Sequence, residues 1–171
     1  MRCIGEWLLL CSQLQLIDDE FTAREATLAF MWSKMHVANV SEASERRQLL
    51  HLGFEDFMEA LVRIATMKCL PTDDEVAVSG FDDAGQMLLA MSAIPANYAA
   101  FRAARPTRWN EPLRQPIWRA VHHLICLMVR SVGHQVHGCY MLGDLKLTRR
   151  EVATFKKRWQ NAGGGSDGLA K

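Results

Sequence analysis

The sequence predicts an all-helical protein, and three observations lead to that fold class. The stretch 51–68 places apolar residues three and four positions apart, the spacing of one face of an α-helix. Thr-x-x-Glu capping boxes at 22–25 and 148–151 mark helix starts, and 72–75 is a further start signal. No strand alternation is long enough to support a sheet.

Apolar periodicity and helix-breaking residues divide the chain into a series of predicted helices. They cover 5–16, 22–35, 51–68, 83–93, 97–104, 117–132 and 148–159. Pro71 ends the third, because its ring and missing N–H cannot continue a helix. Gly133 is the expected C-cap of the helix that follows Pro116, so 134–143 would be a linker. A partial helical turn is expected within 42–50, and the type of structure at 76–78 stays open.

The same periodicity predicts which side chains form the core. In each helix they are the apolar residues on the most hydrophobic side. For 22–35 these are Leu28, Met31, Trp32 and Met35; for 51–68, Phe54, Phe57, Met58, Leu61, Ile64 and Ala65; and for 117–132, Trp118, Val121, Leu124, Ile125, Met128 and Val129.

Charge is divided unevenly along the 171 residues, of which 49% are hydrophobic and 23% charged. Residues 1–100 carry 7 Lys/Arg and 15 Asp/Glu, a net charge of −8, whereas 101–160 carry 12 Lys/Arg and 3 Asp/Glu, a net charge of +9. Either the two halves attract each other, or the basic half meets an acidic partner. The length allows one domain, or one domain with an appended helical segment.

The five cysteines are odd in number and include no CxxC pair, which favours free thiols in a reducing compartment. The apolar run near the N-terminus is short and interrupted by polar residues, unlike a signal peptide, and no run approaches the ~20 apolar residues of a membrane span. We therefore expect a cytoplasmic protein with no membrane partner.

The order of elements around 51–68 resembles an EF-hand: a helix, a polar loop, and then LGFEDF opening a second helix. In that family a hydrophobic residue occupies loop position 8, an acid occupies position 12, and an aromatic residue follows; Leu52, Asp56 and Phe57 fit these places. FMWSKM, followed after a charged loop by FEDFMEALVRIA, is similar to the degenerate EF-hand-like domains of ciliary and flagellar (axonemal) proteins. The resemblance covers 5–95.

The calcium loop itself departs from the family pattern. Counting back from Asp56 places Glu45, Arg47 and Leu49 at ligand positions 1, 3 and 5, and Leu50 stands where a glycine permits the sharp turn. Calcium needs six to eight oxygen ligands, usually including a bidentate Glu at position 12. Glu45 and Asp56 remain the calcium candidates. Further oxygens could come from Asn39, Ser41, Glu42 and Ser44.

A second group of candidate ligands could bind zinc. The candidates are His122 (or His123), Cys126, His134, His137 and Cys139. His122 and Cys126 are four residues apart on one helix face, and a turn at Gly133 could bring the others to them in a tetrahedral site. The alternative is that Cys126 is a core residue and the histidines make polar contacts. Cys126 or Cys139 could also be a nucleophile, but no motif supports a hydrolase.

The basic half combines cations with tryptophans, which suits either a phosphate backbone or an acidic protein. No nucleic-acid-binding motif is present, so a nucleic-acid-binding protein is an alternative only. The residues expected to contact a partner are Arg102, Arg105, Arg108, Trp109, Arg114, Lys156, Lys157, Arg158 and Trp159.

The sequence thus predicts a degenerate EF-hand-like helical module (1–95), a basic helical extension (96–160) and a disordered Gly-rich tail (161–171). The expected function is non-catalytic: a structural or adaptor protein that binds other proteins. The family resemblance implies an axonemal or other cytoskeletal assembly, with acidic surfaces such as those of tubulin as partners. No cofactor is expected. A calcium-responsive regulatory protein is the first alternative.

Overall fold

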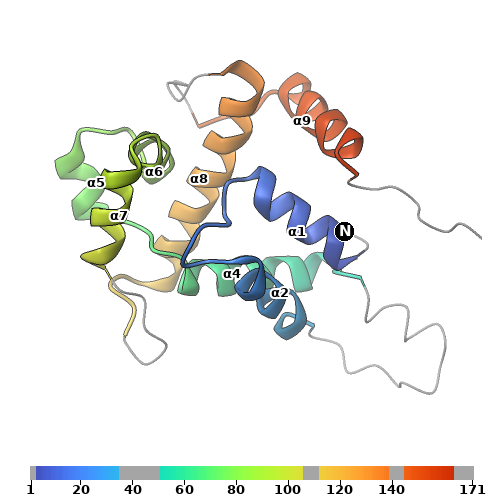
Figure 1. Ribbon diagram of the computed structural model, residues 1–171, viewed down its shortest axis with the longest axis horizontal. Coiled ribbons are helices and arrows are strands. Elements are labelled where there is room, and N and C mark those ends of the chain that lie inside the picture. The colour runs from blue at the N-terminus through green and yellow to red at the C-terminus, as the bar shows by residue number, and fades with distance from the viewer. Residues whose placement is uncertain (1–2, 35–50, 106–111, 139–144, 164–171) are drawn as a thin grey trace, which may run out of the picture.

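The all-helical fold class is confirmed. The computed structural model describes residues 3–34, 51–105, 112–138 and 145–163, and within these ranges its regular elements are eight helices and no strand (Figure 1). The helices are α1 (Ile4–Gln13), α2 (Ala23–Trp32), α4 (Phe54–Met67), α5 (Asp73–Ser79), α6 (Ala84–Ser92), α7 (Pro95–Ala103), α8 (Ile117–His137) and α9 (Arg149–Asn161). The expected turn within 42–50 lies outside the described residues.

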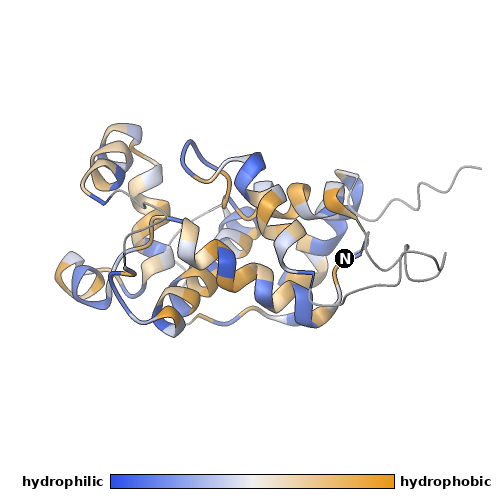
Figure 2. Ribbon diagram, turned by 90° about the horizontal axis from the view of Figure 1, so that it is seen from below, coloured by the Kyte–Doolittle hydropathy of each residue, from blue (hydrophilic) through white to orange (hydrophobic). Residues whose placement is uncertain are grey.

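Helix α8 is the centre of the packing. The most extensive contact between helices in the described chain is that of α6 with α8, followed by that of α4 with α8. In Figure 1, α5, α6 and α7 lie on one side of α8, and α1 and α2 lie toward the other. The buried apolar residues form a cluster to which α1, α2, α4, α6, α7 and α8 all contribute. Most helices carry hydrophobic and hydrophilic residues together, as amphipathic helices do (Figure 2).

Gly85 allows α6 and α8 to approach closely. A Cβ atom at this position would lie 2.5 Å from the backbone oxygen of Cys126 and 2.7 Å from the backbone nitrogen of Leu127. Only a residue without a side chain fits at that distance. The contact therefore fixes how deeply α6 sits against the central helix.

Trp7 joins α1 to α2 and α4. Its indole N–H donates to the backbone oxygen of Ala26 at 2.7 Å, and its ring lies against Phe30 and edge-on to Phe57, at centroid distances of 6.5 Å and 6.2 Å. The side chain is only 1% exposed. A buried tryptophan with a bonded N–H adds both apolar burial and a fixed orientation.

The predicted helix starts at Thr22, Thr72 and Thr148 are confirmed. In each, the glutamate three residues later accepts a hydrogen bond from the threonine N–H, at distances of 3.0, 2.8 and 2.6 Å. Helix α1 ends in a Schellman motif, in which Gln15 N–H donates to Ser12 and Leu16 N–H donates to Cys11. Gln15 takes the left-handed conformation there, with φ of 57°.

The expected end of the long helix at Gly133 was wrong. Helix α8 continues to His137 and is ended by Gly138, which is left-handed with φ of 72°. Val132 and Gly133 are both buried, so packing carries the helix past Gly133. The predicted 134–143 linker therefore begins as helix. At the other terminus α9 extends to Asn161, and residues 164–171 of the predicted tail lie outside the described residues.

Several residues predicted to be in the core are exposed to solvent instead. Met31 and Trp32 are 58% and 46% exposed, because α2 instead buries Ala26, Ala29 and Phe30. Phe54 and Met58 of α4, and Trp118 and Ile125 of α8, are likewise exposed. These helices carry apolar residues around much of their circumference, so periodicity alone does not fix their rotation.

Of the helices in the described residues, none combines the length and the hydropathy that crossing a membrane requires.

Candidate functional site

Arginines of the basic half pair with carboxylates of the acidic half. These ion pairs tie α7, α8 and the segment before α8 to the α1–α2 connection, α5 and the start of α6. The pairs are Arg102–Asp19 at 3.0 Å, Arg105–Glu75 at 2.9 Å, Arg114–Glu75 at 2.7 Å, Arg119–Asp73 at 2.9 Å and Arg130–Asp83 at 2.6 Å. Attraction between the halves, the first of the two alternatives, thus occurs within the described chain.

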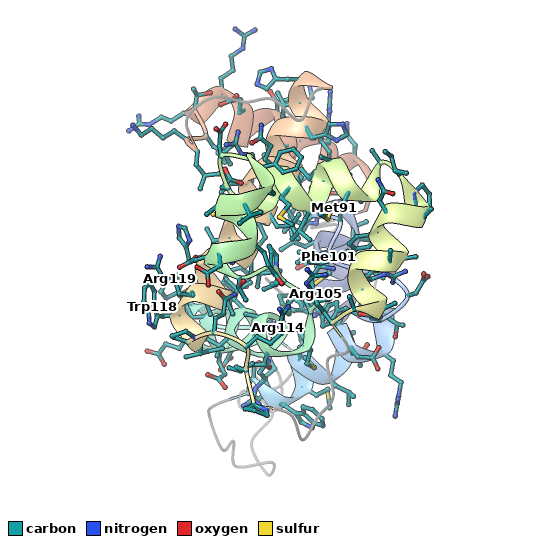
Figure 3. The ribbon with its side chains drawn as sticks, turned by 90° about the vertical axis from the view of Figure 1, so that its left-hand side faces the viewer. Met91, Phe101, Arg105, Arg114, Trp118 and Arg119 are labelled. Carbon is teal, nitrogen blue, oxygen red and sulfur yellow. The ribbon has the colours of Figure 1, made fainter. Side chains whose placement is uncertain are left out.

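Glu75 is the meeting point of two of these arginines. Its Oε1 accepts from both Arg105 and Arg114, while its Oε2 accepts from the Thr72 N–H. The two arginines lie near each other in Figure 3. Burial raises the pKa of the Glu75 carboxyl, but the hydrogen bonds from Arg114, Thr72 and Arg105 outweigh it and lower the pKa below its usual value. Arg105 also lies over the Phe101 ring, 4.1 Å from its centroid. Of the predicted partner-binding residues, Arg105 and Arg114 therefore make internal contacts.

His123 is buried beside this cluster, with both ring nitrogens engaged. Nδ1 lies 2.8 Å from the backbone oxygen of Pro71, and Nε2 lies 2.8 Å from Oδ1 of Asp73. The side chain is 5% exposed. Since both ring nitrogens face oxygen atoms of the chain, neither is positioned to act as a base toward a nucleophile. The contacts join α8 to the segment between α4 and α5 and to the first residue of α5.

Cations on α9 differ from those of α7 and α8. Within the described residues, Arg149, Arg150, Lys156 and Lys157 make no ion pair, and α9 has no buried residue. Glu151, the acid of this helix, is already bonded to His137 and to Thr148, and these hydrogen bonds lower its pKa to about 2. We call the exposed side of α9, formed by Arg149, Arg150, Val152, Lys156 and Lys157, the α9 surface.

Two further predicted partner-binding residues lie at the edge of the α9 surface. Arg158 donates to the backbone oxygen of Gln135 in α8, and Trp159 is half-buried. Phe155 packs against the core cluster and holds α9 on the body of the protein. Arg102 pairs with Asp19, whereas Arg108 and Trp109 lie outside the described residues.

The predicted zinc ligands are not brought together. His122 and Cys126 do lie close, with Nε2 and Sγ 3.8 Å apart. His134 and His137 lie on the same helix, however, and a rise of 1.5 Å per residue puts His134 about 18 Å along the axis from His122. No group of three or more potential metal ligands occurs among the described residues, which exclude Cys139.

Cys126 also lacks the features of a reactive thiol. Burial and the nearby Asp83 carboxylate raise its pKa to about 11. A nucleophilic cysteine needs the opposite, an environment that lowers the pKa. Cys126 instead lies at the close contact with Gly85.

The calcium candidate Asp56 caps a helix. It is 7% exposed, and its Oδ2 accepts a hydrogen bond of 3.0 Å from the Gly53 N–H at the start of α4. A carboxylate in the first turn also complements the helix dipole. Glu45 and the other loop candidates lie outside the described residues.

Asp18, Lys68 and Tyr98 form a polar cluster that the sequence interpretation missed. Asp18 follows the predicted helix 5–16, Lys68 is the last residue of the predicted helix 51–68, and no contact between them was expected. A signal was present in Lys68, which follows Ile64 and Ala65 by four and three residues and so shares their apolar face. A lysine on that face must be buried with a partner.

Comparison with known proteins gives no relative: no family model, no curated protein and no solved structure matches the chain.

Proposed function

We propose that this protein is a non-catalytic adaptor that binds an acidic surface of a protein partner through α9. The observation that supports the proposal is the division of its cations. Arginines on α7, α8 and the segment before α8 are paired with internal carboxylates, whereas the cations of the α9 surface face solvent. Charge without an internal partner is the charge available to another molecule.

The placement of charge on α9 adds to this argument. Arg149 and Arg150 occupy the first two positions of the helix, where the dipole is positive. Each cation there opposes the dipole at a cost of about 0.3–1 kcal/mol. Helix stability alone would favour acids at these positions, so a binding role accounts better for the arginines.

Apolar groups accompany the cations. Val152 is 48% exposed on the same helix, and the half-buried Trp159 lies beside Lys156 and Lys157 in sequence. Protein interfaces commonly combine an apolar or aromatic centre with a polar rim. The combination favours a protein partner with acidic and apolar groups over a phosphate backbone alone.

The family resemblance suggests where such a partner occurs. Ciliary and cytoskeletal assemblies contain acidic surfaces, of which the tubulin tails are an example. We therefore extend the proposal to a structural subunit of an axonemal or other cytoskeletal assembly, with the helical frame used for packing and α9 for contact.

Co-sedimentation with microtubules, with and without their acidic tails, tests the proposal. We expect binding that needs the tails and that weakens at least about tenfold at low salt in a Lys156→Glu/Lys157→Glu variant. Arg24→Glu is the control for reversing a cation elsewhere, with a charge change of −2 against −4 for the double variant. Arg24 is suitable because it is 83% exposed and its ion pair is a 3.8 Å contact with the neighbouring Glu25. The control should bind within about twofold of the unchanged protein.

Four results would contradict the proposal. One is equal binding to microtubules that lack their tails, and another is equal weakening by both substitutions. The third is tighter binding of a single-stranded RNA that Lys156→Glu/Lys157→Glu abolishes, which would support the nucleic-acid alternative instead. Micromolar calcium binding in a calorimetric titration of the same sample would replace the structural role with a regulatory one.

A further inference from the structure

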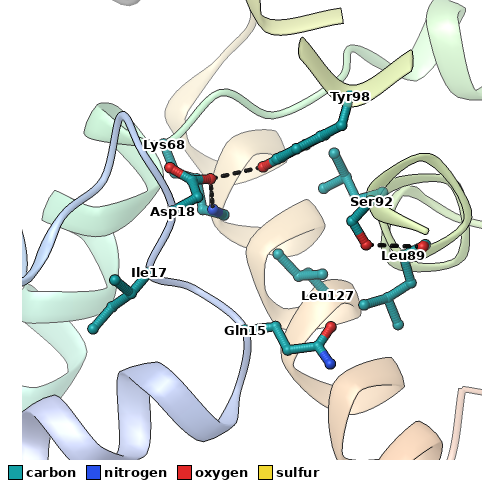
Figure 4. Close-up of a pocket in the computed structure, with 9 residues that line it drawn as sticks. Gln15, Ile17, Asp18, Lys68, Leu89, Ser92, Tyr98 and Leu127 are labelled. Carbon is teal, nitrogen blue, oxygen red and sulfur yellow. Dashed lines mark hydrogen bonds and ion pairs between the residues drawn. The ribbon is translucent and has the colours of Figure 1, made fainter. Parts of the chain in front are cut away.

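A small pocket opens where the α1–α2 connection meets α4, α6, α7 and α8. Its volume is about 150 Å³. Asp18 comes from the connection, Lys68 from the end of α4, Tyr98 from α7 and Leu127 from α8, and their side chains surround one space (Figure 4). None of its lining residues belongs to α9, so the pocket is independent of the proposed partner surface.

One wall of the pocket is polar and charged. Lys68 Nζ lies 2.7 Å from Oδ2 of Asp18 and donates to the backbone oxygen of Leu16 at 2.9 Å. Tyr98 OH donates to the same Asp18 oxygen at 2.7 Å. The other oxygen of Asp18 accepts from the N–H groups of Glu20 and Phe21. The Asp18 carboxylate is therefore saturated with donors.

Lys68 retains one donor. An ammonium group carries three protons, and two acceptors are found for Lys68 within the described part of the chain. The side chain is 2% exposed. A buried ammonium proton without an acceptor is costly, and an oxygen placed in the pocket would satisfy it.

The opposite wall is aliphatic. Leu89 is 1% exposed and Leu127 is 3% exposed, and both line the space. Ser92 lies at the rim, with its hydroxyl bonded to the backbone oxygen of Leu89 at 2.9 Å. Apolar walls with a few convergent polar groups are the usual composition of a small-molecule site.

Gln15 gives a second indication of a site. It occupies the left-handed position that ends α1, where glycine is the favoured residue, and its side chain lines the pocket. Glutamine is thus present at a position whose left-handed backbone conformation favours glycine. Its amide can donate and accept hydrogen bonds at the rim.

We propose that the pocket binds a small neutral molecule that has an apolar body and one hydrogen-bond-accepting oxygen, which takes the remaining proton of Lys68. A space of this size holds about six to nine non-hydrogen atoms, since a cavity of about 150 Å³ accepts benzene. The molecule is neutral because Asp18 and Lys68 already balance each other. A bound anion would leave a buried net negative charge, and a cation would face the ammonium group.

Phenol, toluene and benzoate are the probes for the test, since phenol and toluene have the same shape and differ in the oxygen. Protein with labelled methyl groups is titrated with each probe and followed by NMR. We expect phenol to shift the Leu89 and Leu127 methyl signals saturably, with a Kd of about 1 mM. Toluene and benzoate should each bind at least about tenfold more weakly.

Two variants locate the binding. Ser92→Phe adds a ring at the rim and should abolish the shifts caused by phenol. Thr66→Phe is the matched control, because Thr66 is also exposed and its hydroxyl bonds the carbonyl three residues earlier, yet it does not line the pocket. The control should bind phenol unchanged. Intermolecular NOEs from phenol to the two leucine methyls give the same information without a variant, should Ser92→Phe fail to fold.

The proposal is wrong if phenol causes no saturable shift up to 20-fold above the expected Kd. It is also wrong if toluene or benzoate binds as tightly as phenol, or if phenol binds equally to folded Ser92→Phe.

Discussion

The contact between α6 and α8 predicts that Gly85→Ala is strongly destabilising, although alanine is the better helix former. The added Cβ would meet backbone atoms of Cys126 at 2.5 and 2.6 Å. Neither helix can relieve this overlap by turning a side chain, because the atoms in contact are backbone. The two helices must separate instead.

The size of the effect follows from that separation. Ordinary van der Waals contact needs about 3.4 Å or more, so the helices must move apart by roughly 0.9 Å. A gap of that size removes about a quarter to a half of the dispersion energy of the facing atoms. Overpacking of this kind costs about 1–3 kcal/mol and occasionally more, and loss of packing around Met87, Leu88 and Leu89 places it at the upper end. The higher helix propensity of alanine offsets about 1 kcal/mol of this cost. The upper end of about 3 kcal/mol less about 1 kcal/mol leaves an expected net loss of about 2 kcal/mol.

Urea denaturation followed by far-UV circular dichroism measures this difference. Gly5→Ala is the matched control: Gly5 lies in α1, is exposed, and its added Cβ would have Cys3 Sγ as its near neighbour at 3.8 Å. That variant should be unchanged or more stable by up to about 1 kcal/mol. If Gly85→Ala is as stable as Gly5→Ala, the α6–α8 packing described above is incorrect.

Three other outcomes are expected. Gln15→Gly should raise the free energy of unfolding by about 0.5–1 kcal/mol, because glycine adopts the left-handed φ of 57° without strain. The corresponding increase in Tm is about 1–4 °C in a thermal melt, and a lower Tm would contradict this. Burial raises the pKa of Asp18, but the charge and hydrogen bond of Lys68, with bonds from Phe21 and Tyr98, outweigh it and lower the pKa below 3.8. The stability that the Asp18 carboxylate contributes is therefore fully present above pH 3.8 and is lost as the pH falls further. The urea midpoint should therefore fall less between pH 5 and pH 3 in Asp18→Asn than in the unchanged protein, and equal losses would show that Asp18 is not responsible. Because Asp56 caps α4, we expect 1 mM calcium to change the Tm by no more than about 1 °C. A calcium site present at 100 times its Kd would instead raise the free energy of unfolding by about 2.7 kcal/mol, and the Tm with it.

Local sequence signals predicted the three capped helix starts well. The three Thr-x-x-Glu starts depend on atoms within four residues of each other, so the sequence contains the whole interaction. Gly133 shows the limit of such signals. A glycine ends a helix only where the surrounding packing does not continue it, and residues from other helices decide that.

Long-range features could not be predicted in the same way. The charge asymmetry indicated attraction, but which arginine meets Glu75 depends on how α5, α7 and α8 converge. Helices with wide apolar surfaces could rotate in several ways, so Trp32 and Trp118 were assigned to the core and are exposed. The Asp18–Lys68 pair spans 50 residues, and no local pattern connects its members.

The central place of α8 has a consequence for how the protein is made. The segments that α8 covers end at Ser92, and its own last residue, His137, follows 45 positions later. At 5–20 residues per second, synthesis of that stretch takes about 2–9 s. During this interval the apolar faces of α4 and α6 that pack against α8 are not yet covered by it. The net charge of −8 over residues 1–100 opposes association between such unfinished chains, because like charges repel, and the basic half that offsets this charge is made last.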